Sequence, residues 1–395
     1  MKYSKERILT THVGSLGRPD SLLPLLKLKE QQHPYDRDEL ARRVREAVAN
    51  VVRKQIEAGI DIVTDGEQGK SGFFTYIVER FNGFERKQPA PGKEMRPRST
   101  GREYLAFPDY YAWSERIAEP FGGRSGRAHG VDTCTGPISY RGHAAVQADI
   151  DNLKAATAGL AHEDIFVPAI AASYVAATFA NEYYRTHEEY EQAVSAALRE
   201  EYKAIVDAGF ILQIDDPRLV TYYMMHPELS VADCRKWAAA RVEAINESLR
   251  GIPSEKVRFH TCYSIDVGPR IHEMDLQDIV DIMLKINAGA YSFEAANPRH
   301  EHEYHVFERI KLPEGKILIP GIISHTTNLV EHPELVAERI VRFAKLVGRE
   351  NIIAGADCGF AASALRFNDT HPSIAWLKFA ALAEGARLAT RELWK

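Results

Sequence analysis

Residues 210–215 read FILQID and residues 257–262 read VRFHTC, with an amphipathic stretch over 231–249 between these two apolar runs. Each run is short, contains β-branched and aromatic residues, and ends in polar side chains, a pattern typical of a buried strand. A strand, a helix and a second strand in this order form a βαβ unit with parallel strands. The same alternation of strand-like and amphipathic segments continues in both directions along the chain.

Eight such strand-like runs alternate with amphipathic stretches. The predicted strands cover residues 8–14, 60–65, 165–170, 210–215, 257–262, 290–294, 316–320 and 351–356. The predicted helices cover residues 38–58, 188–208, 231–249, 276–286, 333–346 and 374–388. Eight strand-then-helix units favour a closed (β/α)8 TIM barrel of the α/β class over an open sheet. We therefore predict a single catalytic barrel domain over residues 1–395.

One long interruption follows the second predicted strand. Residues 84–150 are rich in Pro, Gly, Arg and Tyr, and this stretch is too long for a plain connection. It contains Trp113 and a strand-like VDTCT at 131–135, which favours a folded element over a disordered linker. Because it follows the C-terminal end of a strand, we expect it over the face where barrel active sites lie. It is predicted to be an inserted lid or interaction segment.

Composition excludes several classes of protein. The formal charge of −5 argues against nucleic-acid binding, which usually needs a basic excess. No stretch reaches the roughly 18 apolar residues that span a bilayer, and the first ten residues, MKYSKERILT, lack the features of a signal peptide. The four cysteines are too few for a disulfide scaffold. These features predict a cytoplasmic protein without membrane or nucleic-acid partners, and they leave homo-oligomerisation open.

Polar residues follow the predicted strands at the end where barrel chemistry is expected. They are His12-Val13-Gly14-Ser15, Asp65-Gly66-Glu67, Asp215-Asp216-Pro217, His260-Thr261-Cys262, Glu294, His325 and Asp357-Cys358-Gly359. Any one of these groups can be explained as a helix cap or a loop residue. Seven groups at one end of a barrel are hard to explain by capping, and they indicate an active site.

Four of these residues have side chains that suit a metal. His260 and Cys262 lie two residues apart, so they point to the same side of an extended strand. Cys358 and Glu294 follow other strands. Two sulfurs, an imidazole and a carboxylate favour zinc over magnesium or calcium. The spacing itself is a weak signal, so the residues alone leave a zinc site and a site without metal both open.

The other cysteines and a histidine cluster carry weaker signals. Cys134 and Cys234 are predicted to be small buried residues of a strand-like segment and a helix. His300, His302 and His305 suggest either a second metal site or a polar loop and a first helical turn after the sixth strand. The second interpretation is favoured. Because this loop would lie on the catalytic face, it is also a candidate for contact with the substrate.

An ordered set of motifs resembles the catalytic barrel of cobalamin-independent methionine synthases. The motifs are THVGSLGRP, TDGEQGKSGFF, LQIDDP, HTCYS, FEAANPRHEHE, PGIISHTTNLVEHPE and ADCGF. The likeness covers nearly the whole chain outside residues 84–150. It implies a (β/α)8 barrel with Zn²⁺ as cofactor, held by His260, Cys262, Glu294 and Cys358.

The resemblance also implies roles for other positions. Gly14 and Ser15 match the backbone and the hydroxyl that hold the carboxylate of homocysteine. Glu67 and Asp215 match the carboxylates that bind its ammonium group, and His325 matches the histidine that helps to protonate the departing methyl donor. The implied activity resembles that of 5-methyltetrahydropteroyltriglutamate–homocysteine methyltransferase, a zinc-dependent step of methionine biosynthesis.

Two parts of the family pattern are absent. Asp216 stands where the synthases usually have Glu, so its role is left open. The sequence also lacks the N-terminal half that helps long relatives to hold polyglutamyl folate, so the methyl donor can be methyl-folate or a methyl-corrinoid protein. The alternative enzyme joins another thiol, such as coenzyme M, to an epoxide-like carbon. A non-catalytic zinc barrel that binds a corrinoid or thiol partner is a further alternative, which Glu67, Asp215 and His325 disfavour. The HxC motif and Cys358 disfavour a zinc-free decarboxylase-like barrel.

Overall fold

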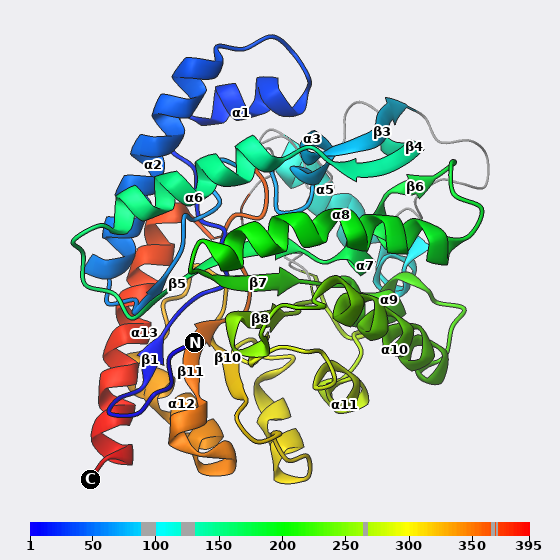
Figure 1. The fold of residues 1–395 in the computed structure, drawn as a ribbon. Coiled ribbons are helices and arrows are strands. Elements are labelled where there is room, and N and C mark those ends of the chain that lie inside the picture. Colours follow the sequence, from blue (N-terminus) through cyan, green and yellow to red (C-terminus); the bar gives the residue numbers. More distant parts are fainter. Residues whose placement is uncertain (88–99, 120–130, 264–267, 365–367, 369) are drawn as a thin grey trace.

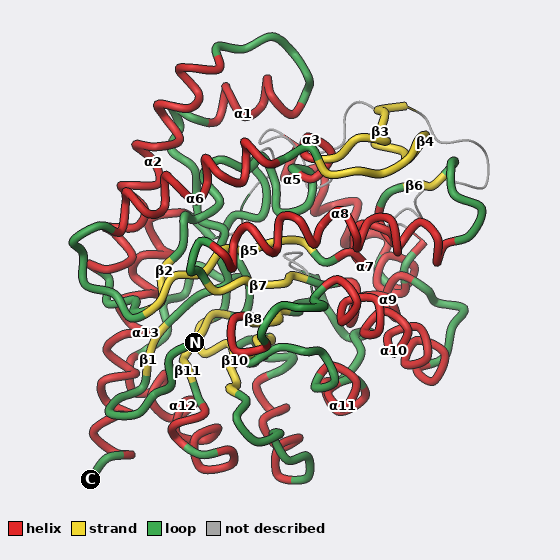
Figure 2. The backbone as a smooth tube through the Cα atoms, in the orientation of Figure 1, coloured by secondary structure: helices red, strands yellow, loops and turns green. Residues whose placement is uncertain are grey.

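The computed structural model describes residues 1–87, 100–119, 131–263, 268–364, 368 and 370–395. Its main sheet has eight strands: β1 (Leu9–Thr10), β2 (Ile62–Val63), β5 (Asp164–Ile170), β7 (Ile211–Asp215), β8 (Val257–His260), β9 (Ala290–Phe293), β10 (Ile317–Ile323) and β11 (Ile353–Ala356). All are parallel, in the order β1-β11-β10-β9-β8-β7-β5-β2 (Figures 1 and 2). Each lies within or beside a predicted strand, which confirms the eight-stranded α/β barrel.

The sheet curves round until its two outermost strands, β1 and β2, lie side by side. Polar groups of Thr10 and Asp61 connect them along this seam. The backbone N–H of Asp61 donates to the carbonyl of Thr10 at 3.2 Å. The Asp61 side chain in turn accepts from the backbone N–H of Thr10 at 2.8 Å. The barrel is therefore nearly closed, and the side chain of Asp61 completes the seam.

One end of the barrel interior is filled by apolar side chains. This inner layer consists of Leu9, Ile62, Phe166, Ile211, Ala290, Ile317, Ile319 and Ile353. Arg258 lies above Phe166, with its guanidinium carbon 3.5 Å from the ring centroid. Its Nε donates to Gln213 at 2.6 Å, and another guanidinium nitrogen donates to Thr11 at 3.0 Å. The hydrogen bonds allow this buried cation to stay inside the barrel.

The outer ring of helices matches the prediction in most places. The α-helices are α1 (Leu23–Glu30), α2 (Arg37–Glu57), α3 (Ile77–Arg80), α4 (Arg102–Ala106), α5 (Pro108–Ala118), α6 (His143–Thr157), α7 (Ala172–Thr178), α8 (His187–Asp207), α9 (Arg218–Met225), α10 (Val231–Ser248), α11 (Val280–Met283), α12 (Pro333–Val347) and α13 (Pro372–Leu393). Several of the long helices begin at side-chain caps, as at Thr186 before α8 and Ser230 before α10. Within the described residues, no helix combines the length and the apolar character needed to cross a membrane.

Two of the predicted strand-then-helix units differ from the structure. The helix predicted over 276–286 consists of the 3₁₀ turn η4 (Leu276–Asp278) and the short α11. Ile279, which joins the two pieces, has φ −130° and ψ −22°, outside the helical region, so one continuous helix does not form. Between β9 and β10 the ring contains the 3₁₀ helix η5 (Glu301–Glu308), which packs against α12. Further 3₁₀ turns are η3 (Ser254–Lys256) and η6 (Arg349–Asn351).

The segment after β2 forms a small second sheet beside the barrel. Strand β3 (Phe81–Lys87) pairs antiparallel with β4 (Val131–Tyr140), and β4 pairs parallel with β6 (Ala180–Asn181). This sheet lies at the upper right of Figure 1, where β4 packs against α8. The predicted insertion of 84–150 also includes the start of α6, but α6 packs between α2 and α8 and belongs to the barrel's ring of helices.

Helix α4 connects this segment to the barrel. Arg102 donates to the backbone carbonyls of Tyr223 and His226 at 2.9 and 3.2 Å, at the end of α9. Glu103 is buried and accepts from the backbone N–H of His272 at 2.7 Å, in the loop that follows β8. The segment therefore contacts the barrel at the face where the strands end.

Candidate metal centre and thiol site

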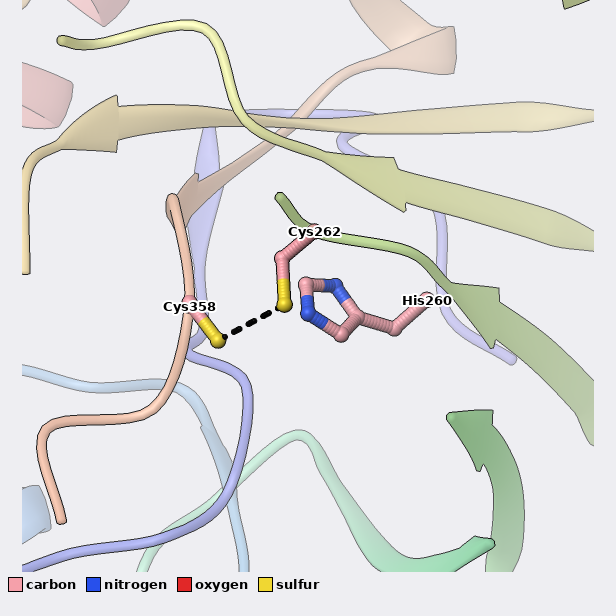
Figure 3. A group of neighbouring side chains, drawn as sticks. All are labelled: His260, Cys262 and Cys358. Carbon is pink, nitrogen blue, oxygen red and sulfur yellow. Dashed lines mark hydrogen bonds between the residues drawn. The ribbon is translucent and has the colours of Figure 1, made fainter. Parts of the chain in front are cut away.

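Three predicted metal ligands lie together at the ends of two strands (Figure 3). His260 ends β8, Cys262 follows it two residues later, and Cys358 follows β11. One ligand atom from each lies within 4.8 Å of the others. The two sulfurs are 3.1 Å apart and remain free thiols. All three side chains are buried, so the cluster is held inside the barrel mouth.

His260 is prepared to donate a lone pair. Its Nδ1 lies 3.0 Å from the hydroxyl of Ser292, while the buried Nε2 has no hydrogen-bond partner. Burial, with the positive charges of Arg258 and His325, lowers the pKa of His260 to about 3. The imidazole is therefore neutral at physiological pH. A buried imidazole nitrogen without a partner fits a metal ligand.

The two thiols also fit a cation. The pKa of Cys358 is raised well above its usual value by its hydrogen bond to Cys262, by burial, and by the negative charges of Cys262 and Glu294. A divalent cation would offset this cost of ionisation, and two sulfurs with one imidazole nitrogen suit zinc. By contrast, Cys134 and Cys234 lie outside the cluster, and burial raises the pKa of each to about 11. Their predicted role as small buried residues fits this environment.

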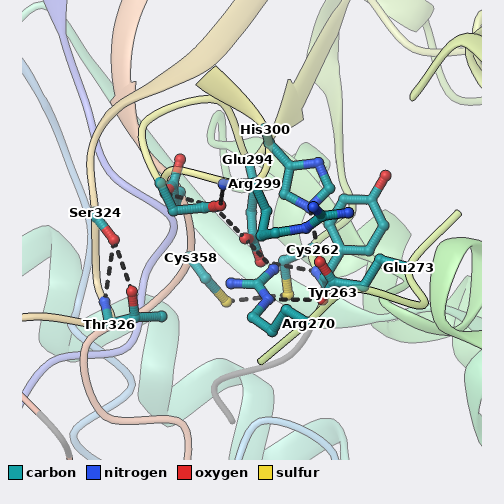
Figure 4. A network of polar contacts seen from close by, with 12 residues as sticks. Cys262, Tyr263, Arg270, Glu273, Glu294, Arg299, His300, Ser324, Thr326 and Cys358 are labelled. Carbon is teal, nitrogen blue, oxygen red and sulfur yellow. Dashed lines mark hydrogen bonds and ion pairs between the residues drawn. The ribbon is translucent and has the colours of Figure 1, made fainter. Parts of the chain in front are cut away.

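Glu294, the fourth predicted ligand, lies outside this three-residue cluster. It follows β9, and its Oε1 accepts from the backbone N–H of Tyr263 at 2.8 Å. Its Oε2 pairs with Arg270 at 2.7 Å and accepts from the amide of Asn297 at 2.8 Å (Figure 4). The structure thus brings three of the four predicted ligands together and pairs the fourth with an arginine.

The histidines after the sixth strand do not gather as a metal site. His300 is buried between Glu273 and Glu303, at 2.9 and 2.7 Å from their carboxylates. Burial lowers its pKa, but the hydrogen bonds to these carboxylates outweigh burial and raise it to about 9. His300 is therefore a buried cation, whereas His302 and His305 are exposed. This arrangement agrees with the predicted polar loop and helical turn.

Two buried carboxylates, Glu67 and Asp215, mark the predicted ammonium site. Glu67 follows β2, and its buried Oε2 has no hydrogen-bond partner. Asp215 ends β7 and accepts from the amide of Gln213 at 2.7 Å. The pKa of Asp215 is raised well above its usual value by burial and by the charge of Glu67. The pKa of Glu67 is raised by burial, although Lys70 and Arg18 oppose this shift. Such a pair favours a cationic ligand.

The predicted carboxylate-binding residues lie between these two sites. Gly14 has a φ of +136°, and a Cβ at this position would meet Pro168 at 2.6 Å, so only glycine fits without movement. The carbonyl of Ser15 accepts from Phe360 at 2.9 Å. A Cβ on Gly359 would meet the Ser15 hydroxyl at 2.5 Å. Ser15 is therefore packed against the residue that follows Cys358.

His325 and Asp216 differ in what surrounds them. His325 is buried after β10, and its charge contributes to the pKa shifts of His260 and Asp357. It therefore lies close enough to the metal cluster to act on it electrostatically. Asp216 accepts from the hydroxyl of Ser173 and from the backbone N–H of Arg218, the first residue of α9. Its contacts support a structural role at the start of that helix.

Sequence reasoning missed several residues around the site. Arg258 and Gln213 had a detectable signal, because each precedes a predicted site residue by two positions on the same strand and so shares its inward face. Arg270 and Glu273 had none, because they lie in a loop without periodicity. The structure alone places these two beside Glu294.

Comparison with known proteins agrees with this architecture. A family model described as "Cobalamin-independent synthase, Catalytic domain" matches residues 170–377, which is more than half of the chain. The chain belongs to this family. The match includes Asp215, the three clustered ligands, Glu294 and His325, whereas the residues that follow β1 and β2 precede it.

Proteins named as methionine synthases match over nearly the full chain. A methionine synthase of Thermococcus kodakarensis is 26% identical over 97% of this chain and 94% of its own length. One from Saccharolobus solfataricus is 26% identical over 97% and 95%. A B12-independent methionine synthase structure from Shewanella sp. W3-18-1 shares 22% identity, covers 98% of this chain and 99% of its own, and has a TM-score of 0.70. This last likeness confirms the barrel fold.

Proposed function

We propose that this protein is a zinc-dependent methyltransferase that transfers a methyl group to the thiol of homocysteine and releases methionine. The observation that carries the proposal is the buried group of His260, Cys262 and Cys358 at the barrel mouth, beside the carboxylates of Glu67 and Asp215. The methionine synthases that match over 97% of the chain support it, as does the Shewanella relative, which was solved with selenomethionine.

One group of residues would bind the metal, and another would bind the amino-acid part of the substrate. His260, Cys262 and Cys358, together with Glu294, would hold the zinc. Bound zinc would remove the thiol proton of the substrate and keep its sulfur nucleophilic. A site with two free thiols needs a compartment that keeps them reduced, which supports the predicted cytoplasmic location.

The amino-acid part of the substrate would be held by the neighbouring loops. The ammonium group fits between Glu67 and Asp215, whose pKa values are raised by burial even though Arg18 lies 3.9 Å from Glu67 and Lys70 acts on both carboxylates. The carboxylate fits the hydroxyl of Ser15, beside Gly359, and the backbone of Gly14, whose N–H donates to Nδ1 of His12 at 3.2 Å and would exchange this bond for one to the substrate. This clamp would direct the thiol toward the cysteines and exclude thiols that lack an ammonium group.

Methyl transfer forms a sulfur–carbon bond and breaks the bond between the methyl carbon and its donor. The donor atom keeps the electron pair of the broken bond. Where that atom is a folate nitrogen, it must also take up a proton. His325 would supply this proton. It is buried, and its charge acts on the pKa of His260, so it lies near the metal cluster.

The methyl donor would approach from the side of residues 84–150. Within the described part of this segment, Tyr104 and Tyr111 stack with centroids 3.7 Å apart and line a small cavity with Tyr263 and Arg270. These rings support a role for the segment as a lid that receives the donor, either methyl-folate or a methyl-corrinoid protein.

Product analysis tests the proposal directly. Zinc-loaded protein would be offered homocysteine or coenzyme M, each with methyl-folate, methylcobalamin or a small epoxide. Methionine from homocysteine is the expected product. A thioether of coenzyme M formed from the epoxide, without any methionine, would show instead the alternative alkyltransferase.

His325→Asn should separate the two methyl donors. The variant should slow transfer from methyl-folate by about 10²-fold or more, the usual value of a general acid. Transfer from methylcobalamin should slow much less, because its leaving group needs no proton. The measurement is the single-turnover rate with each donor. Equal slowing with both would assign His325 to substrate positioning.

Amino-acid binding should release a proton. Burial and the charge of Glu67 raise the pKa of Asp215 in the free protein, so this carboxyl keeps its proton to a higher pH than an ordinary aspartate. A bound ammonium group favours the ionised form, so affinity should increase with pH until Asp215 is fully ionised. Calorimetric titration with methionine, which has no thiol proton, in two buffers of different ionisation enthalpy measures this release. Asp215→Asn should abolish it, and a proton release that persists in that variant would assign it to another group.

A further inference from the structure

The Glu294 carboxylate has a complete set of partners away from the two thiols. Tyr263 donates to one of its oxygens at 2.8 Å, and Arg270 and Asn297 donate to the other at 2.7 and 2.8 Å (Figure 4). Tyr263 directly follows Cys262, so its 2.8 Å hydrogen bond holds the carboxylate beside the cluster. Glu294 is thus held beside the metal cluster by an arginine.

Arg270 is built into this position. It is buried, and it is one of three non-glycine residues with a positive φ among the described residues, at +56°. This conformation is unfavourable for a side chain with a Cβ and persists only where contacts maintain it. Its Nε pairs with Glu273 at 2.7 Å, which leaves Nη2 directed to Glu294.

The charges around Arg270 balance without Glu294. Arg270 and the protonated His300 supply two positive charges, and Glu273 and Glu303 supply two negative charges. If Glu294 moved to the metal, Arg270 would keep Glu273 as its partner. Movement of Glu294 to the metal would therefore leave none of these four buried charges without a partner of opposite sign, a situation that is otherwise costly.

We propose that Arg270 is a positioning residue that receives the Glu294 carboxylate when the substrate thiol takes its place beside Cys262 and Cys358. This inference rests on the proposed function, because it needs a metal and a thiol. In it Glu294 alternates between two cationic partners, the metal and the guanidinium. Arg270 thereby lowers the cost of exchanging a carboxylate for a thiol.

The test measures zinc and thiol binding rather than turnover. In Arg270→Met, Glu294 loses its second partner and should remain on the metal. Competition with a chelator should show zinc affinity increased, and calorimetry should show homocysteine affinity decreased, each by about tenfold, the effect of one charged hydrogen bond. X-ray absorption at the zinc edge should count fewer sulfurs at a fixed homocysteine concentration. Arg270→Lys, which keeps the charge, should lie between the variant and the wild type.

A double-mutant cycle separates this role from structural support. In a Glu294→Gln background there is no carboxylate to receive, so Arg270→Met should not change homocysteine affinity further. Arg241→Met, which removes another buried arginine paired with a glutamate, serves as the matched control and should leave both affinities unchanged. Weaker zinc binding in Arg270→Met, or an effect on homocysteine that persists with Glu294→Gln, would overturn the proposal. If the unmodified protein itself bound no zinc, the proposed function would fail instead.

Discussion

Replacement of Cys262 or Cys358 by serine should leave the purified protein with little zinc and no measurable methyl transfer. Each thiol supplies one of two sulfurs, and serine is a poor ligand for zinc at neutral pH. Loss of a supporting group behind a ligand already costs about 10- to 100-fold in metal affinity, so loss of a direct ligand should exceed that range. Metal content by plasma mass spectrometry and zinc-edge absorption measure the effect.

The two remaining cysteines supply a matched control for this experiment. Cys134 and Cys234 are as deeply buried as the cluster thiols but lie outside it. Cys234→Ser should therefore retain one zinc per chain and the wild-type rate. Full zinc and full activity in either Cys262→Ser or Cys358→Ser would show that the ligand assignment is incorrect.

Glu67→Gln should produce the second large effect, a loss of homocysteine affinity of at least about thirtyfold. The substitution keeps the shape of the side chain but removes a buried charge that would pair with the ammonium group, and such pairs cost heavily when one partner is removed. Coenzyme M carries a sulfonate and no ammonium group, so its weak binding should stay equal or improve. Calorimetric affinities for both thiols measure the difference.

A buried glutamate elsewhere controls for folding. Glu191 on α8 pairs with Arg241 away from the site, and Glu191→Gln should leave both thiol affinities unchanged. If Glu67→Gln weakened both thiols to the same degree, Glu67 would support the loop rather than select the substrate. Glu67 has a φ of +55°, a backbone conformation that is unfavourable for a residue with a Cβ and persists only where contacts maintain it. Contacts of its side chain that maintain this conformation would produce that alternative outcome.

Much of the fold could be predicted because its strands have a simple pattern. Runs such as FILQID and VRFHTC are short and apolar, and they recur between amphipathic helices, so eight parallel strands follow from the order of the chain. Three features that differ from the prediction have physical reasons. One is the helix predicted over 276–286, which is divided at Ile279. The sixth crossover is a 3₁₀ helix, and the start of α6 directly follows β4, so composition placed it inside the insertion.

The candidate site could be predicted where residues end strands. His260, Cys262 and Cys358 converge because barrel strands end at one face, and the backbone fixes their positions. Glu294 also ends a strand, but its side chain is oriented by Arg270, which comes from a loop of no regular period. Long-range ion pairs of this kind depend on tertiary packing, and a single sequence does not contain the distance between their partners.

The junction between β1 and β2 lets a bound substrate stabilise the barrel. Among the described residues β1 and β2 are not paired by a backbone ladder, and Thr10, Thr11 and Asp61 join them largely through side-chain hydrogen bonds, so this is where the barrel would open most easily. The proposed clamp has one half on each side, with Gly14 and Ser15 after β1 and Glu67 after β2. An amino acid bound between them would connect the loops that follow these two strands. A bound amino acid would then reduce the local opening of the barrel between β1 and β2, and release of methionine would allow this opening again.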